Sequence, residues 1–386
     1  MNDIRTPTSP RPRIAFVVNG AEASAMGDRA KRFAAHLADR FDIAVAYRSG
    51  SKLASIRSFV RFLGVEKPAL TYVFDPSYSG VIAAWIHRTR HGNRVIVDTG
   101  DAIYELVRSS GSRGKLGQWL TFLLEKLALH MADHVVVRGT FHKQILDDQE
   151  IPCSVIQDGV ETDLFAPRDE RDFRRRIGVV DEVTIGLIGS SSWSPRLQIC
   201  YGWELVEVLR LLKDKRIKGI MVGDGSGIEI LRQRAREYGI EDKMIFLGRL
   251  ALERLPEALG AMDICLSTQT NNIAGRVRTT GKLPIYMAAG RFILASRVGE
   301  ASLVLPDEML VDFTGERDPE YPAKIAERVC EILKKPSMLQ MGGGNIDIAR
   351  ARFDYRLLAA RLGDIIDHVL RGTLPARGEV PFEKRR

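Results

Sequence analysis

A basic, glycine-bearing segment at residues 275–290, GRVRTTGKLPIYMAAG, carries the clearest chemistry in this chain. A helix is expected to begin inside it. A helix N-terminus offers free backbone N–H groups and a partial positive charge, and added cations suit such a place to a phosphate or a diphosphate. Taken alone, the segment fits a basic loop before an ordinary helix equally well. The residues that would meet a phosphate here are Arg276, Arg278, Thr280, Gly281 and Lys282.

Two glycine-containing turns precede this segment, each between a strand-like run and a helix-like run. They are VGDGSG at 222–227 and the turn in FLGRL at 246–250. Glycine lets the backbone approach a phosphate closely, although a plain strand-to-helix turn has the same composition. A nicotinamide site would need an acidic residue at the end of the next strand. That strand ends at Gly248, which Arg249 follows, and this disfavours a dehydrogenase.

Taken in order, these segments resemble the second half of a GT-B glycosyltransferase of family four, the retaining type called glycosyl transferases group 1. The matching stretches are 222–225, 246–248, 261–263 and 281–290, and VIQDGVETDLFAP at 155–167 is similar to the family's interdomain signature. The resemblance implies transfer of a sugar, with retention, from a nucleotide diphosphate sugar to a carbohydrate or lipid-linked acceptor. Cell-surface polysaccharide or lipopolysaccharide biosynthesis is the implied setting. The nucleotide pocket would be walled by Gly223, Gly225, Gly248 and Leu250.

Strand-like runs alternate with helix-like runs along the chain, which indicates parallel, doubly wound sheets. We therefore expect an α/β fold. It would have two Rossmann-like doubly wound parallel-sheet domains facing a central cleft, which is the GT-B arrangement. The expected division is an acceptor-side domain at 1–170 and a donor-side domain at 171–345. A final helix at about 345–370 would pack back on the first domain, and a loose tail would follow within 346–386.

The resemblance also assigns a phosphate clamp. The family usually has an arginine just after the first strand of the second domain and a lysine a few residues later, but Ser190 stands in the arginine's place. Arg196 is the nearest cation, so the expected clamp is Arg196 with Lys282, helped by Arg276 or Arg278. A solvated turn residue is an equally good interpretation of Arg196.

Two family glutamates are missing, because Val277 and Ile285 fill their places. The second glutamate normally holds the donor ribose. Glu300 is the candidate replacement, although a helix-start glutamate favoured by the dipole fits it as well. The absence leaves two alternatives open: an active enzyme with a relocated ribose contact, or a non-catalytic GT-B nucleotide-binding partner or scaffold in a polysaccharide assembly complex.

In the first domain, Gly20 ends the first strand where the family often has glycines that approach the donor. Asp98 and Asp101, in VDTGDA, follow a later strand. The resemblance implies that both bind the acceptor and orient the acceptor or the sugar, and that Asp101 is catalytic. Asp101 is alternatively a simple cap of the helix that follows.

Composition narrows the partners. The chain has 386 residues, 45% hydrophobic, and a net charge of +8. Phosphorylated small molecules and an anionic membrane surface both suit this sign, whereas no nucleic-acid-binding signature is present. The basic amphipathic segments 52–67 and 115–126 suit either a lipid surface or an ordinary helix. The four cysteines are far apart in sequence, as in a reduced cytosolic protein.

Neither a cofactor nor a metal is expected, because cations can neutralise the diphosphate. His130 and His134 lack the additional ligands that a zinc site needs. The first residues, MNDIRTPTSPRPR, contain no apolar signal segment. The expected location is the cytoplasm, with a peripheral position at the inner face of the membrane left open.

Overall fold

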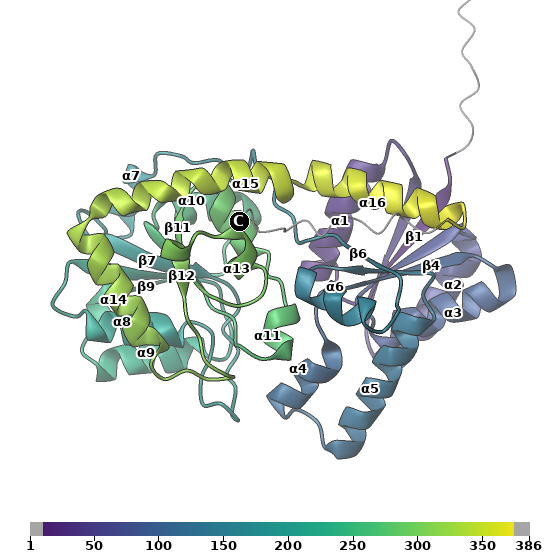
Figure 1. The fold of residues 1–386 in the computed structure, drawn as a ribbon, viewed down its shortest axis with the longest axis horizontal. Coiled ribbons are helices and arrows are strands. Elements are labelled where there is room, and N and C mark those ends of the chain that lie inside the picture. Colours follow the sequence, from purple (N-terminus) through teal and green to yellow (C-terminus); the bar gives the residue numbers. More distant parts are fainter. Residues whose placement is uncertain (1–10, 374–386) are drawn as a thin grey trace, which may run out of the picture.

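Residues 11–373 are described by a computed structural model, and they form two parallel sheets that lie side by side (Figure 1). The strand order is β2-β1-β3-β4-β5-β6 in the first sheet and β12-β11-β10-β7-β8-β9 in the second. All neighbouring strands are parallel. This confirms the expected pair of Rossmann-like, doubly wound domains. Residues 1–10, and residues 374–386 of the tail expected to be loose, lie outside the described residues.

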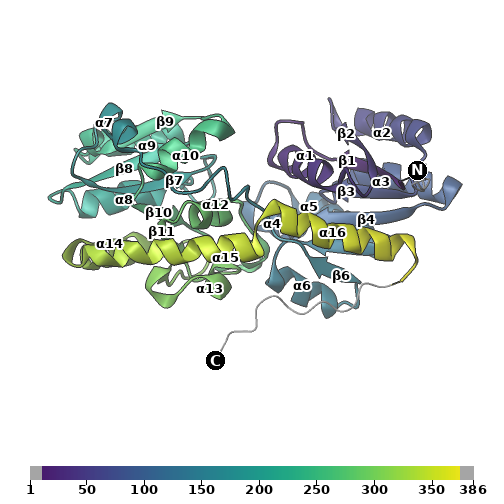
Figure 2. The same cartoon turned by 90° about the horizontal axis from the view of Figure 1, so that it is seen from above.

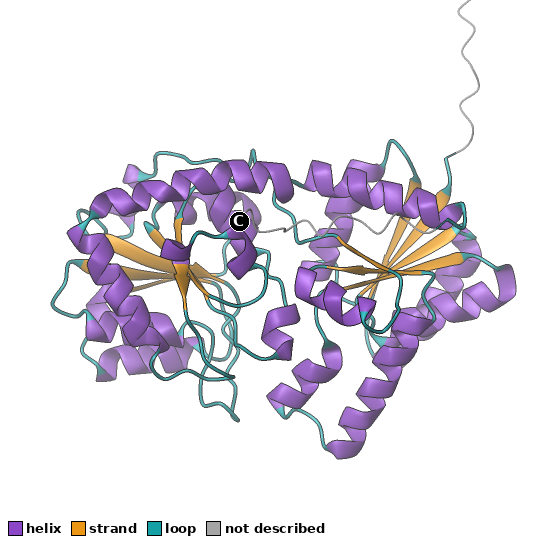
Figure 3. Cartoon of the chain, in the orientation of Figure 1, coloured by secondary structure: helices purple, strands orange, loops and turns teal. Residues whose placement is uncertain are grey.

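The first sheet contains β1 (Arg13–Val18), β2 (Asp42–Tyr47), β3 (Leu70–Phe74), β4 (Arg94–Thr99), β5 (His134–Val137) and β6 (Cys153–Val155). Its helices are α1 (Ala25–Leu37), α2 (Lys52–Glu66), α3 (Tyr78–His91), α4 (Ile103–Ser110), α5 (Lys115–His130) and α6 (Thr140–Asp147). Helices lie against both faces of the sheet (Figure 3). The strands are therefore apolar on both sides. Ile14 and Phe16 of β1 join one core cluster, and Ala15 and Val17 join the other.

The second sheet contains β7 (Val183–Ile188), β8 (Ile217–Val222), β9 (Met244–Gly248), β10 (Ile264–Ser267), β11 (Phe292–Ser296) and β12 (Leu310–Val311). Its helices are α7 (Arg171–Arg176), α8 (Trp203–Leu211), α9 (Ile228–Glu237), α10 (Leu255–Gly260), α11 (Ile273–Val277), α12 (Lys282–Ala288), α13 (Ala301–Val304) and α14 (Tyr321–Lys334). One large core fills this domain. The expected boundary at residues 170 and 171 falls between the two sheets, and its exact place stays a prediction.

The single terminal helix expected at 345–370 is two helices, α15 (Gly344–Arg352) and α16 (Tyr355–Leu370). The α15 helix packs on α12 in the second domain, and α16 packs on α1 in the first (Figure 2). The chain breaks at Phe353 and Asp354 because Val160 intervenes there. Val160 N–H donates to the Phe353 carbonyl at 2.8 Å, and the Val160 carbonyl accepts from Tyr355 N–H at 3.2 Å. The chain thus crosses between the domains twice at one place.

Candidate active site

The two domains enclose a cavity of about 550 Å³ at the carboxyl ends of their strands. This is where open parallel sheets place their ligands. From the first domain it is lined by parts of α1, by the turn after β4, by the end of β5 and by the 158–161 segment. From the second domain it is lined by Ser190, Tyr201, Leu252, Thr268, Gln269, Ile285 and the run from Arg278 to Lys282.

Lys282 is the residue of the cavity best suited to an anion. Its Nζ lies 4.0 Å from the centroid of the Tyr201 ring, and a side chain at Gly189 would come within 3.4 Å of it. No ion pair engages Lys282 within residues 11–373. Burial, and then the neighbouring Arg278 charge, lower the pKa of Lys282 to about 8. An unpaired, desolvated ammonium would regain stability from a bound anion.

Arg278 stands beside Lys282 and links the two domains. Its Nε lies 3.2 Å from Oδ1 of Asp101, and both side chains are partly exposed to the cavity. Asp101 follows β4, and Arg278 follows α11, so the pair closes one side of the cavity. The structure therefore brings together Asp101, Arg278, Thr280, Gly281 and Lys282 from the residues that the sequence singled out.

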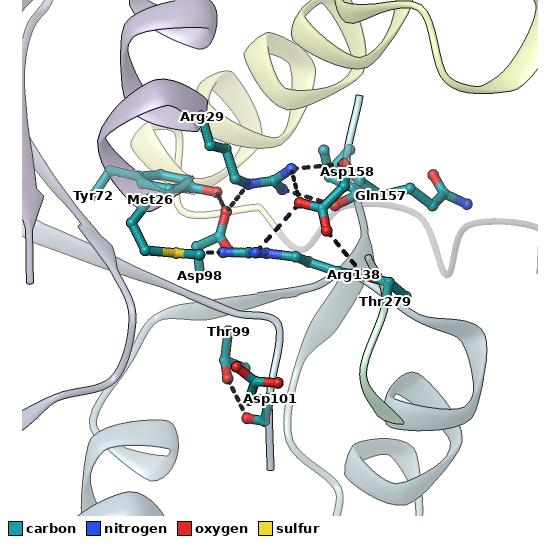
Figure 4. Close-up of polar contacts among 11 residues, drawn as sticks. Met26, Arg29, Tyr72, Asp98, Thr99, Asp101, Arg138, Gln157, Asp158 and Thr279 are labelled. Carbon is teal, nitrogen blue, oxygen red and sulfur yellow. Dashed lines mark hydrogen bonds and ion pairs between the residues drawn. The ribbon is translucent and has the colours of Figure 1, made fainter. Parts of the chain in front are cut away.

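A cluster of two arginines and two aspartates lies in the wall of the cavity (Figure 4), with Arg29, Arg138 and Asp158 in the lining and Asp98 buried behind them. Asp98 accepts hydrogen bonds from Arg29 Nε at 2.9 Å, from the Tyr72 hydroxyl at 2.8 Å and from Arg138 Nε at 3.2 Å. Although burial raises the pKa of Asp98, the charges of Arg29 and Arg138 hold it below its ordinary value. Asp158 lies 3.3 Å from Nη1 of Arg138. The cluster joins α1, β3, β4, the residue after β5 and the segment after β6 that leads toward the second domain.

Asp98 was expected to bind the acceptor, and the structure corrects this. Its side chain is fully buried and does not line the cavity. The strand register turns the carboxylate toward Arg29 and Tyr72. There it forms an ion pair with the Arg29 guanidinium and accepts a hydrogen bond from the Tyr72 hydroxyl. Asp101, by contrast, lies on the turn and faces the cavity.

Arg138 is the functional candidate that the sequence analysis missed. Only 5% of it is exposed, yet it lines the cavity. Its Nε and Nη1 donate to Asp98 and Asp158, whereas within residues 11–373 Nη2 has only the Met26 sulfur as acceptor, at 2.8 Å. Thioether sulfur is a weak acceptor. One arm of the guanidinium therefore keeps capacity for a stronger acceptor.

Some signals for this cluster are present in the sequence. Arg29 lies four residues before Phe33 on the apolar face of its helix, and Arg138 directly follows the apolar strand β5. A charged residue at such a place implies a buried partner. Neither signal names the partner, because Asp98 and Asp158 are distant in sequence.

The structure separates Arg196 from Lys282, contrary to the expected clamp. Arg196 Nη2 lies 2.6 Å from Oε2 of Glu316, and its side chain lines a neighbouring cavity of about 910 Å³. Glu316 also accepts from the Ser109 hydroxyl of the first domain at 2.8 Å. Arg196 therefore supports a contact between the domains.

Arg276 is also outside the cavity. It is an exposed residue of α11, its Nε donates to Asn271 at 2.8 Å, and its guanidinium lies 5.8 Å from the centroid of the Phe141 ring. Because α11 turns this side chain away from Arg278, the expected help to the clamp has no geometric support.

Glu300 is buried between the domains and does not line the main cavity. One of its oxygens accepts a hydrogen bond from the backbone N–H of Thr140, the first residue of α6. Burial raises the pKa of Glu300 to about 7. The carboxyl thus caps a helix of the opposite domain, which explains a glutamate here without a ribose.

The glycines expected at the nucleotide support the site from behind it. Gly223 has a φ of +135°, and a Cβ there would lie 1.9 Å from the carbonyl oxygen of Gly189. Gly225 has a φ of +138°, and a Cβ there would lie 2.3 Å from the carbonyl oxygen of Ser191. Their close approach fixes the loop that carries Ser190. Gly20, Gly223, Gly225, Gly248 and Leu250 do not line the main cavity.

The places of the missing glutamates differ. Ile285 is half-buried and lines the cavity, whereas Val277 is fully buried in the core.

Across residues 11–373 no group of three His, Cys, Asp or Glu side chains could hold a metal ion. In the same part of the chain, no helix has the length and apolar character required to span a bilayer.

Comparison with known proteins identifies the second domain. Residues 184–335 match the family Glycosyl transferases group 1. The chain is 25% identical over 219 residues to D-inositol 3-phosphate glycosyltransferase 2 of Catenulispora acidiphila, a match that covers 55% of this chain and 49% of that protein. It is 27% identical over 218 residues to a GDP-mannose-dependent alpha-(1-6)-phosphatidylinositol monomannoside mannosyltransferase of Mycobacterium tuberculosis, covering 54% of each. The chain spans about half the length of these relatives.

Solved structures share the whole fold. Sucrose-phosphate synthase from Thermosynechococcus elongatus superposes with a TM-score of 0.74 at 17% identity, covering 94% of this chain and 100% of that one. Anabaena HepE in complex with UDP-glucose gives a TM-score of 0.71 at 16% identity, covering 92% and 100%. Residues 184–335 therefore match the glycosyl transferases group 1 family, and the chain as a whole has the GT-B fold.

Proposed function

We propose that this protein is a glycosyltransferase that uses a nucleotide diphosphate sugar as donor. One observation carries the proposal: the interdomain cavity presents the unpaired ammonium of Lys282 beside Arg278 and Thr280. These groups suit a diphosphate bound to the second domain. The family match of that domain and the relatives that act on nucleotide sugars support the same conclusion.

In the proposed reaction, an acceptor hydroxyl attacks the anomeric carbon of the sugar as the bond to the diphosphate oxygen breaks. The proton of the hydroxyl leaves with the departing diphosphate, and the new bond forms on the same sugar face. Lys282 and Arg278 stabilise the charge that develops on the leaving group, and Asp101 orients the sugar or the acceptor. This is electrostatic catalysis combined with positioning. Two fixed cations make a metal unnecessary, so turnover should persist in EDTA.

Ile285 requires a different ribose contact from the one usual in the family. Gln269 and Ser190 are polar side chains in the cavity lining that can meet sugar hydroxyls instead. The acceptor is proposed to be a glycan or a lipid-linked sugar, used in the cytoplasm for cell-surface polysaccharide or lipopolysaccharide synthesis. The relative named as a phosphatidylinositol monomannoside mannosyltransferase supports a lipid-linked sugar as acceptor.

Calorimetry with UDP, GDP and ADP tests the donor site. Anabaena HepE was crystallised with UDP-glucose, so UDP is the first ligand to try. One nucleotide should bind and raise the thermal midpoint, since ligand at about 100 times its dissociation constant adds about 2.7 kcal/mol of stability. Arg278→Gln should weaken binding, whereas Arg276→Gln, which removes a cation outside the cavity, should not. Folded protein that binds none of the three contradicts the donor site.

Turnover then separates an enzyme from a scaffold. The nucleotide that binds is supplied as its glucose and mannose conjugates, and release of nucleoside diphosphate is measured with lipid-linked and soluble glycan acceptors. Stoichiometric binding without any release would favour the non-catalytic partner and refute the enzyme.

A further inference from the structure

Helix α5 carries a row of large apolar side chains that face solvent. Leu116, Trp119, Leu120, Leu123 and Leu127 recur at helical spacing on one face, and their exposed fractions run from 46% for Leu123 to 78% for Leu116. Phe122 is exposed beside them. We call these six residues the α5 ridge. Scattered exposed leucines are ordinary, but a contiguous row on one helix marks an interaction surface.

The ridge lies away from the side of α5 that packs on the domain, although the Phe122 ring lies 5.2 Å from the Tyr104 ring of α4. The side of α5 that packs on the domain buries Thr121, Ala128 and Leu129. Glu125 also faces inward, where its carboxylate accepts from the backbone N–H groups of Ile103 at 2.6 Å and Tyr104 at 2.8 Å, at the start of α4. The α4–α5 hairpin projects from the first domain beyond the edges of the sheets (Figure 1). Its more apolar face therefore lies on the outside of a protruding element.

The charges around the ridge are positive. Arg113, Lys115 and Lys126 are exposed at its ends and flank, and Lys126 Nζ lies 5.4 Å from the centroid of the Phe122 ring. Glu105 of α4 is partly buried and is paired with Arg108. Apolar side chains between flexible cations match a bilayer interface, where the chains enter the acyl boundary and the cations meet anionic headgroups.

We propose that the α5 ridge docks this protein on an anionic lipid surface. A second copy of the chain is the competing partner, but self-association through the ridge would bring its cations against their own copies, in a chain with a net charge of +8. Anionic lipid, by contrast, complements them.

The position of the ridge bears on the acceptor, a point that rests on the proposed function. Asp101, just before α4, lines the main cavity, and Leu106, Ser109 and Ser110 of α4 line the adjoining one of about 910 Å³. The hairpin that would touch the membrane is therefore also a wall of the cleft. A lipid-anchored acceptor could keep its tails in the bilayer while its sugar reached the cavity.

Vesicle sedimentation tests the docking surface without depending on turnover. The full chain is mixed with phosphatidylcholine vesicles that contain 30% phosphatidylglycerol, or none. Wild-type protein should partition about tenfold more strongly onto the anionic vesicles. The double variant Trp119→Ser with Leu123→Ser should lose about tenfold in that partitioning. Its matched control, Val180→Ser with Leu211→Ser, removes two exposed apolar side chains of the second domain and should bind as wild type does.

A charge variant and an oligomerisation measurement complete the test. Lys115→Glu with Lys126→Glu should abolish the preference for anionic vesicles, whereas Lys213→Glu with Lys215→Glu should preserve it. All variants should keep the wild-type thermal midpoint, because none of these side chains is buried. Equal sedimentation of ridge and control variants would overturn the proposal, as would a wild-type dimer in analytical ultracentrifugation that the ridge variant dissociates. Nucleotide binding by a protein that ignores vesicles would refute the docking surface and leave the proposed function standing.

Discussion

At the scale of single residues, Lys282 is expected to be the main contact of the diphosphate. Lys282→Ala should weaken UDP binding by about 2–5 kcal/mol, since a buried charge pair is lost, and should abolish transfer. Uridine lacks the phosphates, so its binding should change little. Calorimetry with both ligands makes the comparison, and an equal loss for UDP and uridine would assign Lys282 a structural role.

The same lysine predicts a pH dependence. Its pKa of about 8 means that the ammonium is present below pH 8 and is lost as pH rises through 8. UDP affinity should therefore fall between pH 7 and pH 9 in wild-type protein. Lys282→Arg keeps its charge throughout this range and should remove the fall. A wild-type affinity that stays constant to pH 9 would contradict the assignment.

Glu300 should affect stability more than donor affinity. Its pKa of about 7 lies above the ordinary value of 4.5, so the folded protein holds a proton there that the unfolded chain releases. This contribution to stability is complete below pH 4.5 and is lost as pH rises through 7. Glu300→Gln should raise the free energy of unfolding at pH 8 relative to wild type, by on the order of 2 kcal/mol, and should have little effect at pH 5. Urea denaturation at the two pH values measures this, and impaired UDP binding in the variant would restore Glu300 to the donor site.

At the scale of elements, the loop after β8 depends on a backbone that only glycine supplies. Gly223→Ala places a Cβ 1.9 Å from the Gly189 carbonyl oxygen at a φ of +135°. We expect it to destabilise the second domain by at least about 3 kcal/mol and to disturb the Ser190 wall of the cavity. Gly64→Ala is the control, because that helical position in α2 has open space around it. It should stabilise slightly, by about 0.5–1 kcal/mol. Thermal and urea midpoints of the two variants should move in opposite directions.

At the scale of the whole molecule, Asp354 holds the place where the chain crosses between the domains. Its carboxylate accepts from Arg356 N–H at 2.9 Å, at the start of α16, and from the Thr162 hydroxyl. Asp354→Ala should lower the free energy of unfolding by about 1–3 kcal/mol. Asp364→Ala on the same helix breaks only an exposed pair with Arg40 and should cost about 0–1 kcal/mol. Equal costs would mean that the crossing needs no cap.

Asp354 also predicts an acid response. Hydrogen bonds from Arg356 lower its pKa to about 2, against an ordinary value of 3.8. The stabilisation it contributes is therefore present above pH 3.8 and is lost as pH falls through 2. The stability difference between wild type and Asp354→Ala should shrink over that interval.

The sequence by itself determined the architecture. Apolar strand-like runs such as β1 and β8 alternate with helix-like runs along the chain, and this local pattern was enough to predict two doubly wound parallel sheets. It also identified the run from Arg278 to Lys282, because its cations, threonines and glycines are neighbours in the chain.

Only the tertiary structure decided which other residues share the site. Asp98 and Asp101 are three positions apart, yet strand register buries the first against Arg29 and leaves the second facing the cavity. Arg138 reaches the cavity from another strand altogether. Such partners are set by sheet order and domain packing, which bring together groups far apart in sequence. The spacing of residues along the chain does not indicate which distant residues come into contact. Neither the burial of Asp98 nor the pairing of Arg196 with Glu316 could therefore be predicted from the sequence.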